Sequence, residues 1–179
     1  MDSDNPIGAD NQQETRLTHL DPWWVAGFVD GEGCFSVSIH RNELARPTAG
    51  WHIQPTFQVT QHHDQRSVLE SIRDFFDCGQ VRSKGSGSSV DVYTVHSTIQ
   101  LEERIIPFFT RYRLRVKGDD FETFAQIVKA IRARSHHNRD VFEDVVRLAY
   151  SMNAIGKQRK RPIEEILMGS SETAREAPH

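Results

Sequence analysis

The sequence lacks the features of several common protein classes. Its 179 residues include only two cysteines, Cys34 and Cys78, which are too few for a disulfide framework and do not have metal-ligand spacing. No apolar run approaches the ~18 residues that a membrane span needs, so we expect no membrane partner. The polar, acidic stretch from Met1 to Arg16 fits neither a secretory signal nor a transit peptide. We expect one soluble, intracellular domain with reduced thiols.

The chain also lacks a net positive charge, which on its own disfavours binding of nucleic acid. The formal charge is −3, but residues 1–32 carry −6, residues 33–118 carry +3, and residues 119–179 are balanced. The positive middle part also contains five of the nine histidines. Because the local distribution of charge matters more than its sum, this pattern permits binding of nucleic acid without establishing it.

Lysine is scarce, with 5 residues against 17 arginines. Most arginine codons are rich in G and C, whereas lysine codons are rich in A and T, so this ratio indicates a GC-rich genome. On this basis we expect a protein of the bacterial cytoplasm rather than of an organelle.

The order of apolar patterns predicts an α+β domain. A helix, two strands, a second helix and two more strands are followed by further helices. One antiparallel four-stranded sheet with helices on one face is the natural architecture for this order. We expect residues 18–169 to form a single domain, with residues 1–17 and 170–179 disordered.

The first predicted helix has a clear start and an unusual composition. Asp21 is expected to cap it, and Pro22 suits its first position. Gly27 and Gly31 each cost about 1 kcal/mol relative to alanine in a helix, and with Ala26 they form a face of small residues. Such a face allows close approach of another backbone. That backbone belongs either to this chain's own sheet or to the same helix in a second copy.

Two carboxylates, Asp30 and Glu32, follow at the end of this helix with a glycine after each. In a single copy, such a pair is typical of a solvated or capping role. In a two-fold dimer, carboxylates and glycine carbonyls from two copies would converge near the axis, and these oxygen donors suit Mg²⁺. Two metal ions can activate water and stabilise the leaving oxygen during phosphodiester hydrolysis.

The segment Val25–Gly33, VAGFVDGEG, resembles the LAGLIDADG motif of homing endonucleases. The similarity runs from about Trp23 to Leu167 and contains one copy of the motif. It implies an αββαββα fold with a saddle-shaped antiparallel sheet. One motif implies a homodimer, and the family's activity implies a metal-dependent double-strand break in a long, pseudo-palindromic DNA site of about 20 base pairs.

The resemblance also implies the metal and its ligands. Glu32 and the carbonyl of Gly31 would bind Mg²⁺, and Mn²⁺ or Ca²⁺ could substitute for binding. Asp30 would brace the end of the helix. Glu32 stands where aspartate is usual in the motif, so its additional methylene group moves the carboxylate relative to the family pattern.

Three further residues resemble parts of the family's catalytic site. Gln61 resembles the residue that orders active-site water, and Lys117 resembles the basic residue near the scissile phosphate. A solvated lysine before a helix is the alternative for Lys117. Related enzymes have an arginine four residues after that glutamine, where this chain has Gln65 followed by Arg66. Either Arg66 takes over this role, or one positive charge is absent.

Two surfaces are expected to contact double-stranded DNA. The polar face of the sheet resembles one that reads base edges in the major groove, although an ordinary solvated face is the alternative. Its expected contacts are Ser36, Ser38, His40, His52, Gln54, Gln58, Arg82, Lys84, Asp91 and Tyr93. The basic run near the C-terminus is either a solvated charge run or a phosphate-contacting loop, through Lys157, Arg159 and Lys160.

The dimer interface is expected on the first helix. Its expected residues are Trp24, Ala26, Gly27, Phe28 and Gly31. Two other functions stay open: a catalytically silent nucleic-acid-binding protein, such as an RNA maturase or a transcription regulator, and a domain without a nucleic-acid ligand that dimerises through this helix.

Two pairs of adjacent histidines, His62–His63 and His136–His137, resemble parts of metal sites or of a His-Asn-His nuclease. Adjacent side chains of a strand point to opposite faces, and no spaced third ligand follows either pair. We therefore expect neither pair to bind a metal.

Overall fold

The structure is a computed structural model that describes residues 20–42, 44, 48, 50–152 and 161–172. The predicted disordered segment 1–17 and residues 173–179 of the predicted tail lie outside these residues. The start of the predicted tail is wrong, because residues 170–172 belong to helix α8. Within the described part of the chain, no helix is long and apolar enough to cross a membrane.

The helices and strands follow the predicted order. Helix α2 leads through two strands to α3, and two more strands lead to the remaining helices. The bounds are α2 Pro22–Glu32, β1 Gly33–Arg41, β2 Trp51–His62, α3 Arg66–Phe76, β3 Gln80–Ser83, β4 Val90–Val95, α4 Thr98–Gln100, α5 Ile106–Arg111, α6 Gly118–Arg132, α7 Arg139–Ser151 and α8 Ile163–Glu172. A π-helical segment, Leu101–Ile105, joins α4 to α5, and short 3₁₀ turns occupy His63–Gln65 and Ser135–His137.

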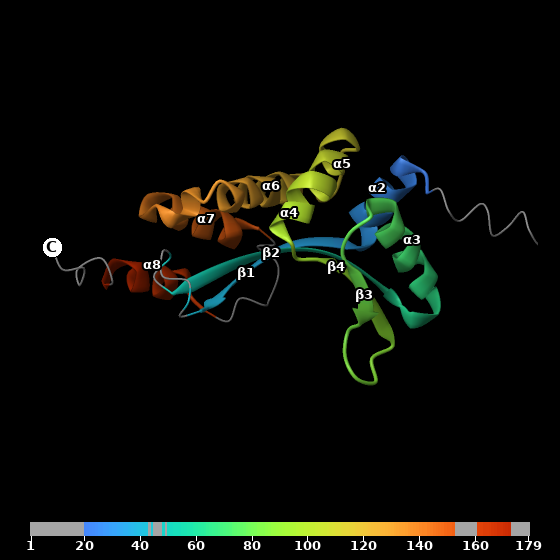
Figure 1. Cartoon of the computed structure of the whole chain (residues 1–179), viewed down its shortest axis with the longest axis horizontal. Helices are drawn as coiled ribbons and strands as arrows, with labels where there is room; N and C mark the ends of the chain where they lie inside the picture. Colours follow the sequence, from blue (N-terminus) through green and yellow to red (C-terminus); the bar gives the residue numbers. More distant parts are fainter. Residues whose placement is uncertain (1–19, 43, 45–47, 49, 153–160, 173–179) are drawn as a thin grey trace, which may run out of the picture.

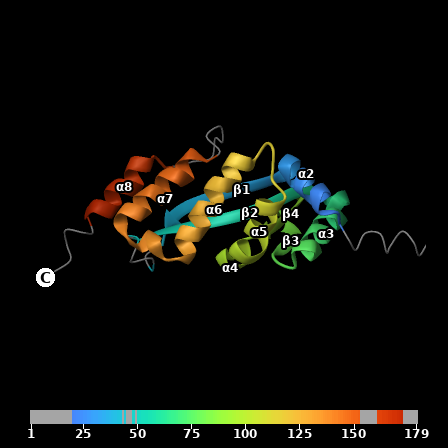
Figure 2. The ribbon, with the colours of Figure 1, turned by 90° about the horizontal axis from the view of Figure 1, so that it is seen from above.

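The four strands form one antiparallel sheet in the order β1-β2-β4-β3. Figure 1 shows a curved sheet with α4 to α7 on one side of β1 and β2, while the other side of these strands is open. Seen from above in Figure 2, α6 and α7 lie across β1 and β2, and α3 lies beside β3 and β4. The predicted α+β fold, with helices on one face of an antiparallel sheet, is confirmed.

Alternate residues of the strands build the core beneath the helices. Phe35 of β1 and Phe57 of β2 are cross-strand partners, and their rings stack with centroids 5.2 Å apart. Phe109 packs edge-on against Phe35 at 5.6 Å, and Phe121 and Phe124 of α6 also contact it. Burial of each such ring contributes roughly 1.5–3 kcal/mol. Because successive strand residues alternate in direction, the intervening polar residues point to the open face.

Helix α3 begins without a side-chain cap. A 3₁₀ turn over His63–Gln65 precedes the helix, and Gln65 makes no side-chain capping bond. The Asp64 carboxylate instead lies against the two histidines before it. The helix ends at Phe76, and Asp77 follows it in the left-handed conformation at φ 50°.

Gly79 provides a test of the close packing between α3 and the sheet. Its φ is +77°, and an added Cβ would lie 2.7 Å from the carbonyl oxygen of Thr94. Gly87, with φ +72° and open space around it, is the matched control. We expect Gly87→Ala to lower the free energy of unfolding by about 1 kcal/mol. Gly79→Ala should lower the free energy of unfolding by at least about twice as much, because the left-handed backbone is strained and the new Cβ also clashes with the Thr94 carbonyl oxygen. Equal losses in urea unfolding would contradict this packing.

Candidate functional site

The site begins at the helix that carries the glycine-rich motif. Asp21 caps α2 as predicted, since its Oδ1 accepts hydrogen bonds from the backbone N–H groups of Trp23 at 2.9 Å and Trp24 at 3.0 Å. The helix passes directly into β1 at Gly33, where a Cβ would lie 2.6 Å from Val29 Cγ1. Only glycine fits this junction without a shift. The last residues of α2 are therefore held against the first residues of the sheet.

Asp30 joins this helix to the loop between α5 and α6. Its carboxylate accepts backbone hydrogen bonds from Arg115 at 2.9 Å, Val116 at 3.0 Å and Lys117 at 2.9 Å. Burial works against ionisation of Asp30, but these N–H groups and the charge of Lys117 outweigh it and lower the pKa of this carboxyl. The prediction that Asp30 braces the end of the helix is confirmed.

The same contact places the Lys117 side chain. Its Nζ donates hydrogen bonds to the carbonyl oxygens of Gly31, at 3.0 Å, and of Asp30. The lysine charge therefore lies at the carbonyl that is the expected metal ligand. A carbonyl oxygen has two lone pairs, so Gly31 can accept from Lys117 and still face a cation.

Glu32 lies beside these groups at the end of α2. Its side chain is exposed, and it has no hydrogen bond or ion pair within the described part of the chain. A free carboxylate next to a carbonyl oxygen offers the hard donors that Mg²⁺ prefers. One chain thus supplies only part of the oxygen shell of such an ion.

The strand register brings Gln61 to the same place. Val59 pairs with Gly33, the first residue of β1, and Gln61 lies two residues further along β2, where it pairs with Asp91 of β4. It therefore extends past the start of β1 towards the end of α2, whose residues contact β2. The backbones of Glu32 and Gln61, which are far apart in the sequence, thus lie towards the same end of the sheet, where Lys117 contacts the end of α2.

Arg66 does not join this group as a free cation. Its Nε lies 2.9 Å from Glu70, one terminal nitrogen lies 3.2 Å from Asp91, and the other donates to the carbonyl oxygen of Val81 at 3.4 Å. The guanidinium therefore connects the start of α3 to β3 and β4. Of the two alternatives, the structure favours the absence of one positive charge over a catalytic Arg66.

The open face of the sheet carries most of the residues predicted to contact DNA. They alternate with core residues of the same strands, and several are strongly exposed. The residues placed there are Ser36, Ser38, His40, His52, Gln54, Gln58, Arg82 and Lys84. His40 and His52 are direct cross-strand partners with ring centroids 5.0 Å apart.

The predicted DNA contacts at Asp91 and Tyr93 are wrong. Both share the inward side of β4 with Val95 and are buried. The Tyr93 hydroxyl donates to the carbonyl oxygen of Cys78 at 3.0 Å, and burial raises its pKa. Asp91 is ion-paired with Arg66. Their polarity indicated the open face, whereas the strand alternation places them in the interior.

Two further polar residues on the open face, Thr56 and His96, were not among the predicted contacts. Thr56 lies between Gln54 and Gln58 on β2, and its hydroxyl is 3.1 Å from Nδ1 of His96. Gln54 also donates to the His96 carbonyl oxygen at 3.0 Å. Burial, followed by the charge of Arg82, lowers the pKa of His96. Alternation along β2 was a sufficient signal for Thr56, but His96 follows the end of β4 and had none.

The basic run with Lys157, Arg159 and Lys160 lies outside the described residues. The expected phosphate contacts therefore stay predictions.

The outer face of α2 carries most of the predicted dimer interface. Cβ atoms added at Gly27 or Gly31 would meet nothing within 4 Å. Trp24 is 44% exposed and stacks on Phe28 with ring centroids 5.0 Å apart. Ala26 is wrongly included in this face, because it points inward with Val25 and Val29 on the buried side of the helix.

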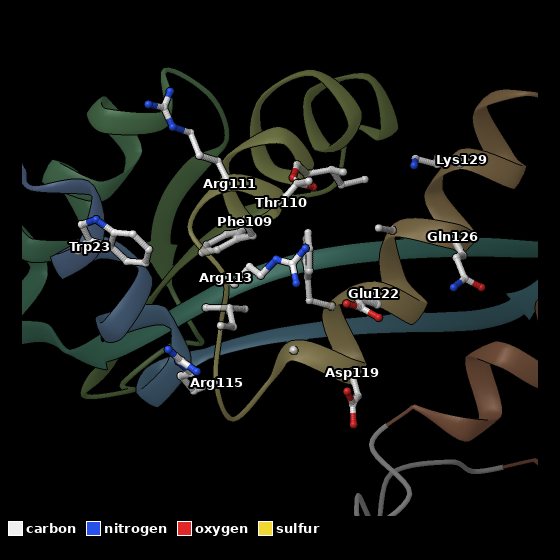
Figure 3. A pocket seen from close by; sticks show the side chains of 15 residues that line it. Trp23, Phe109, Thr110, Arg111, Arg113, Arg115, Asp119, Glu122, Gln126 and Lys129 are labelled. Atoms are coloured by element: carbon white, nitrogen blue, oxygen red, sulfur yellow. The ribbon is translucent and has the colours of Figure 1, made fainter.

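A separate hollow of about 760 Å³ lies on the helical side of the domain, between α5, the following loop and α6 (Figure 3). Three arginines, Arg111, Arg113 and Arg115, line it together with acidic side chains of α6, and Trp23 lies at one end. Neither Glu32 nor Gln61 belongs to its lining. The carboxylate at the end of α2 therefore lies outside this hollow.

Similar proteins exist among known sequences and solved structures. A sequence profile described as LAGLIDADG endonuclease matches residues 25–128. Homing endonuclease I-ApeII of Aeropyrum pernix is 33% identical over 148 residues, covering 80% of this chain and 86% of that protein. DNA endonuclease I-CeuI of Chlamydomonas moewusii is 28% identical over 148 residues, covering 83% and 66%. The archaeal intron-encoded homing endonuclease I-Vdi141I, complexed with DNA, has a TM-score of 0.79 at 26% identity, covering 86% and 96%.

The origins of these relatives correct the expectation of a bacterial cytoplasmic protein. They come from an archaeon, a green alga and the fungus Neurospora crassa, whose probable intron-encoded endonuclease 2 is matched over 33% of its length. This distribution does not favour a bacterium over an organelle. The ratio of arginine to lysine reports codon composition and carries no information on compartment.

The matched region includes the motif helix, all four strands and the loop that places Lys117. The resemblance inferred from the nine-residue motif is thus confirmed over more than half of the chain. The chain belongs to the LAGLIDADG endonuclease family.

Proposed function

We propose that the chain is a site-specific homing endonuclease that makes a double-strand break as a homodimer. The observation that carries the proposal is the free Glu32 carboxylate at the end of α2. It follows a Gly31 carbonyl that accepts a hydrogen bond from the Lys117 ammonium, and Asp30 holds the backbone of Lys117 there. The names of I-ApeII and I-CeuI, and the DNA complex of I-Vdi141I, support the assignment.

The outer face of α2 supports the homodimer. Gly27 and Gly31 leave open space where side chains would stand, and Trp24 and Phe28 form an apolar surface next to them. A second α2 can approach such a face closely. In a two-fold dimer the same surface serves both chains, so the two Glu32 residues, one from each chain, would come together at the axis.

The donor set supports Mg²⁺ as the cofactor. Each chain offers the Glu32 carboxylate and the Gly31 carbonyl, and the remaining octahedral positions would go to water and phosphate oxygens. When bound, the ion polarises the phosphate and makes water a stronger nucleophile. Gln61 would orient a water molecule through its amide, and Lys117 would stabilise negative charge that develops on the phosphate oxygens.

The open face of the sheet supports recognition of double-stranded DNA. It presents hydroxyl, amide, imidazole and guanidinium groups, which can match the donors and acceptors of base edges in the major groove. Arg82 and Lys84 add positive charge on the β3–β4 hairpin, which projects from the sheet in Figure 1. Contacts of such charges with phosphates make binding weaker at higher salt concentration.

The first test replaces the metal ligand. Glu32→Gln should lower the rate of DNA cleavage in Mg²⁺ by about 100-fold or more, because the carboxylate charge is lost. DNA binding in a gel-shift assay should change little. Glu103→Gln, at an exposed glutamate of the π-helical segment, is the matched control and should cut normally. Undiminished cleavage by Glu32→Gln would refute the proposed metal site. A wild-type chain that binds DNA but does not cut it would indicate a catalytically silent DNA-binding protein.

The second test concerns the contact that positions Lys117. Asp30→Asn removes the charge that the backbone N–H groups of residues 115–117 stabilise, so it should lower both the free energy of unfolding and the cleavage rate. The pKa of Asp30 is lowered on folding. Its contribution is therefore complete above the unfolded-state pKa of about 3.9 and is lost as the pH falls through the lower folded-state value. In urea unfolding, the difference in the free energy of unfolding between wild type and Asp30→Asn should disappear at pH values below the folded-state pKa of Asp30. A constant difference would contradict this role of the charge.

The third test concerns the dimer. Gly27→Arg adds a long charged side chain to the outer face of α2, where it meets nothing in its own chain. We expect sedimentation to change from dimer to monomer and cleavage to be lost, while the circular dichroism spectrum is unchanged. Gln126→Arg, on the exposed side of α6, is the control and should stay dimeric. A wild-type chain that stays monomeric on DNA would refute the homodimer.

A further inference from the structure

We propose that His62, His63 and Asp64 form a binding site for a transition-metal ion of the Zn²⁺ class, separate from the oxygen donors at Glu32. Strand β2 ends at His62, and His63 begins a 3₁₀ turn. The alternation of a strand therefore stops between the two histidines. Their rings lie on the same side, with centroids 4.5 Å apart and planes inclined by 36°. The prediction that this pair cannot share a metal is not supported by this geometry.

Asp64 supplies the third ligand that the sequence pattern did not reveal. One carboxylate oxygen lies 3.2 Å from Nδ1 of His62, and the other lies 2.9 Å from Nε2 of His63. One ligand atom from each of the three residues lies within 4.8 Å of the others. All three side chains are exposed, so an ion from solution has direct access.

The backbone of the turn is fixed on both sides. His62 pairs with Val90 of β4, and the N–H of His63 donates to the carbonyl oxygen of Ser89 at 2.8 Å. On the other side, Arg66 begins α3 and is tied to Asp91 and Glu70. Ligands on such a supported turn lose little conformational freedom when they bind an ion.

The chemistry of the donors selects the class of ion. Two imidazole nitrogens and one carboxylate oxygen suit Zn²⁺ and its neighbours in the first transition series. Mg²⁺ prefers oxygen ligands only, so the two sites would bind different ions. Three protein ligands leave at least one coordination position for water or an anionic oxygen.

The other histidine pair offers a matched comparison within the chain. His136 and His137 have ring centroids 4.4 Å apart, which is nearly the same spacing. In the described part of the chain, however, only the cluster at residues 62–64 combines three such ligands. If proximity of two rings were sufficient, both pairs would bind equally well. If the carboxylate is required, only His62 and His63 would bind tightly.

The experiment is a titration of the full, untagged chain with Zn²⁺ by calorimetry in Mg²⁺-free buffer at a fixed pH near 7.5, because metal affinity depends on pH. The visible absorption of Co²⁺ provides a second readout of nitrogen ligation. We expect one equivalent per chain. His62→Ala/His63→Ala should remove this binding, and Asp64→Asn should weaken it by about tenfold or more.

His136→Ala/His137→Ala and Glu32→Gln are the controls, and both should bind Zn²⁺ like the wild type. Circular dichroism verifies that each variant is folded, and Asp64→Asn keeps the test valid if the double variant is not. Absence of Zn²⁺ binding by the wild type would refute the proposal. So would binding that survives in both His62→Ala/His63→Ala and Asp64→Asn, or that is lost in His136→Ala/His137→Ala. Because the readout is metal binding, its result is independent of nuclease activity.

Discussion

The carboxylate of Asp30 holds together the two parts of the chain that the candidate site needs. It accepts backbone hydrogen bonds from residues 115–117 and so fixes a loop that otherwise connects two helices. That loop carries Lys117, whose ammonium group then reaches the carbonyl oxygens at the end of α2. The first acid of the motif is thus structural, while the second, Glu32, is left with a free carboxylate. Two residues of the same charge, two positions apart, thus differ in their contacts, because only Asp30 reaches the loop of residues 115–117.

The sheet separates two functions by the simple alternation of its strands. The inward residues, led by Phe35 and Phe57, pack against the helices and hold α2 and α6 in place. The outward residues are free to be polar, because the open face of β1 and β2 needs no apolar cover (Figure 1). At the end where β2 extends past β1, this open face meets the end of α2. The open polar face and the end of α2 therefore share one rigid support.

Much of this arrangement could be predicted from the sequence where the signal is local. The order of apolar patterns predicted two strands directly after the first helix, which are β1 and β2, and Asp21 with Pro22 predicted the start of α2. Residue type failed as a guide to which side of the sheet a polar residue faces, where that residue has a partner far away in the sequence. The Asp91–Arg66 ion pair and the Tyr93–Cys78 hydrogen bond join residues 25 and 15 positions apart, so residue type alone misplaced Asp91 and Tyr93. The expectation that the rings of His62 and His63 point to opposite faces was wrong, because β2 ends at His62 and the end of a strand cannot be located to one residue from its pattern.

The contact between Asp30 and Lys117 spans 87 positions of the chain. Closing a loop of this length has an entropic cost that local helices and hairpins must offset first, since it grows with the logarithm of the loop length. We therefore expect the contact to form late in folding, after the sheet between the two residues has formed. During synthesis, the segment with Asp30 and Glu32 would be made long before Lys117, which follows Asp30 by 87 positions. On this order of events, Lys117 reaches the carbonyl oxygens at the end of α2 only when most of the domain is already folded.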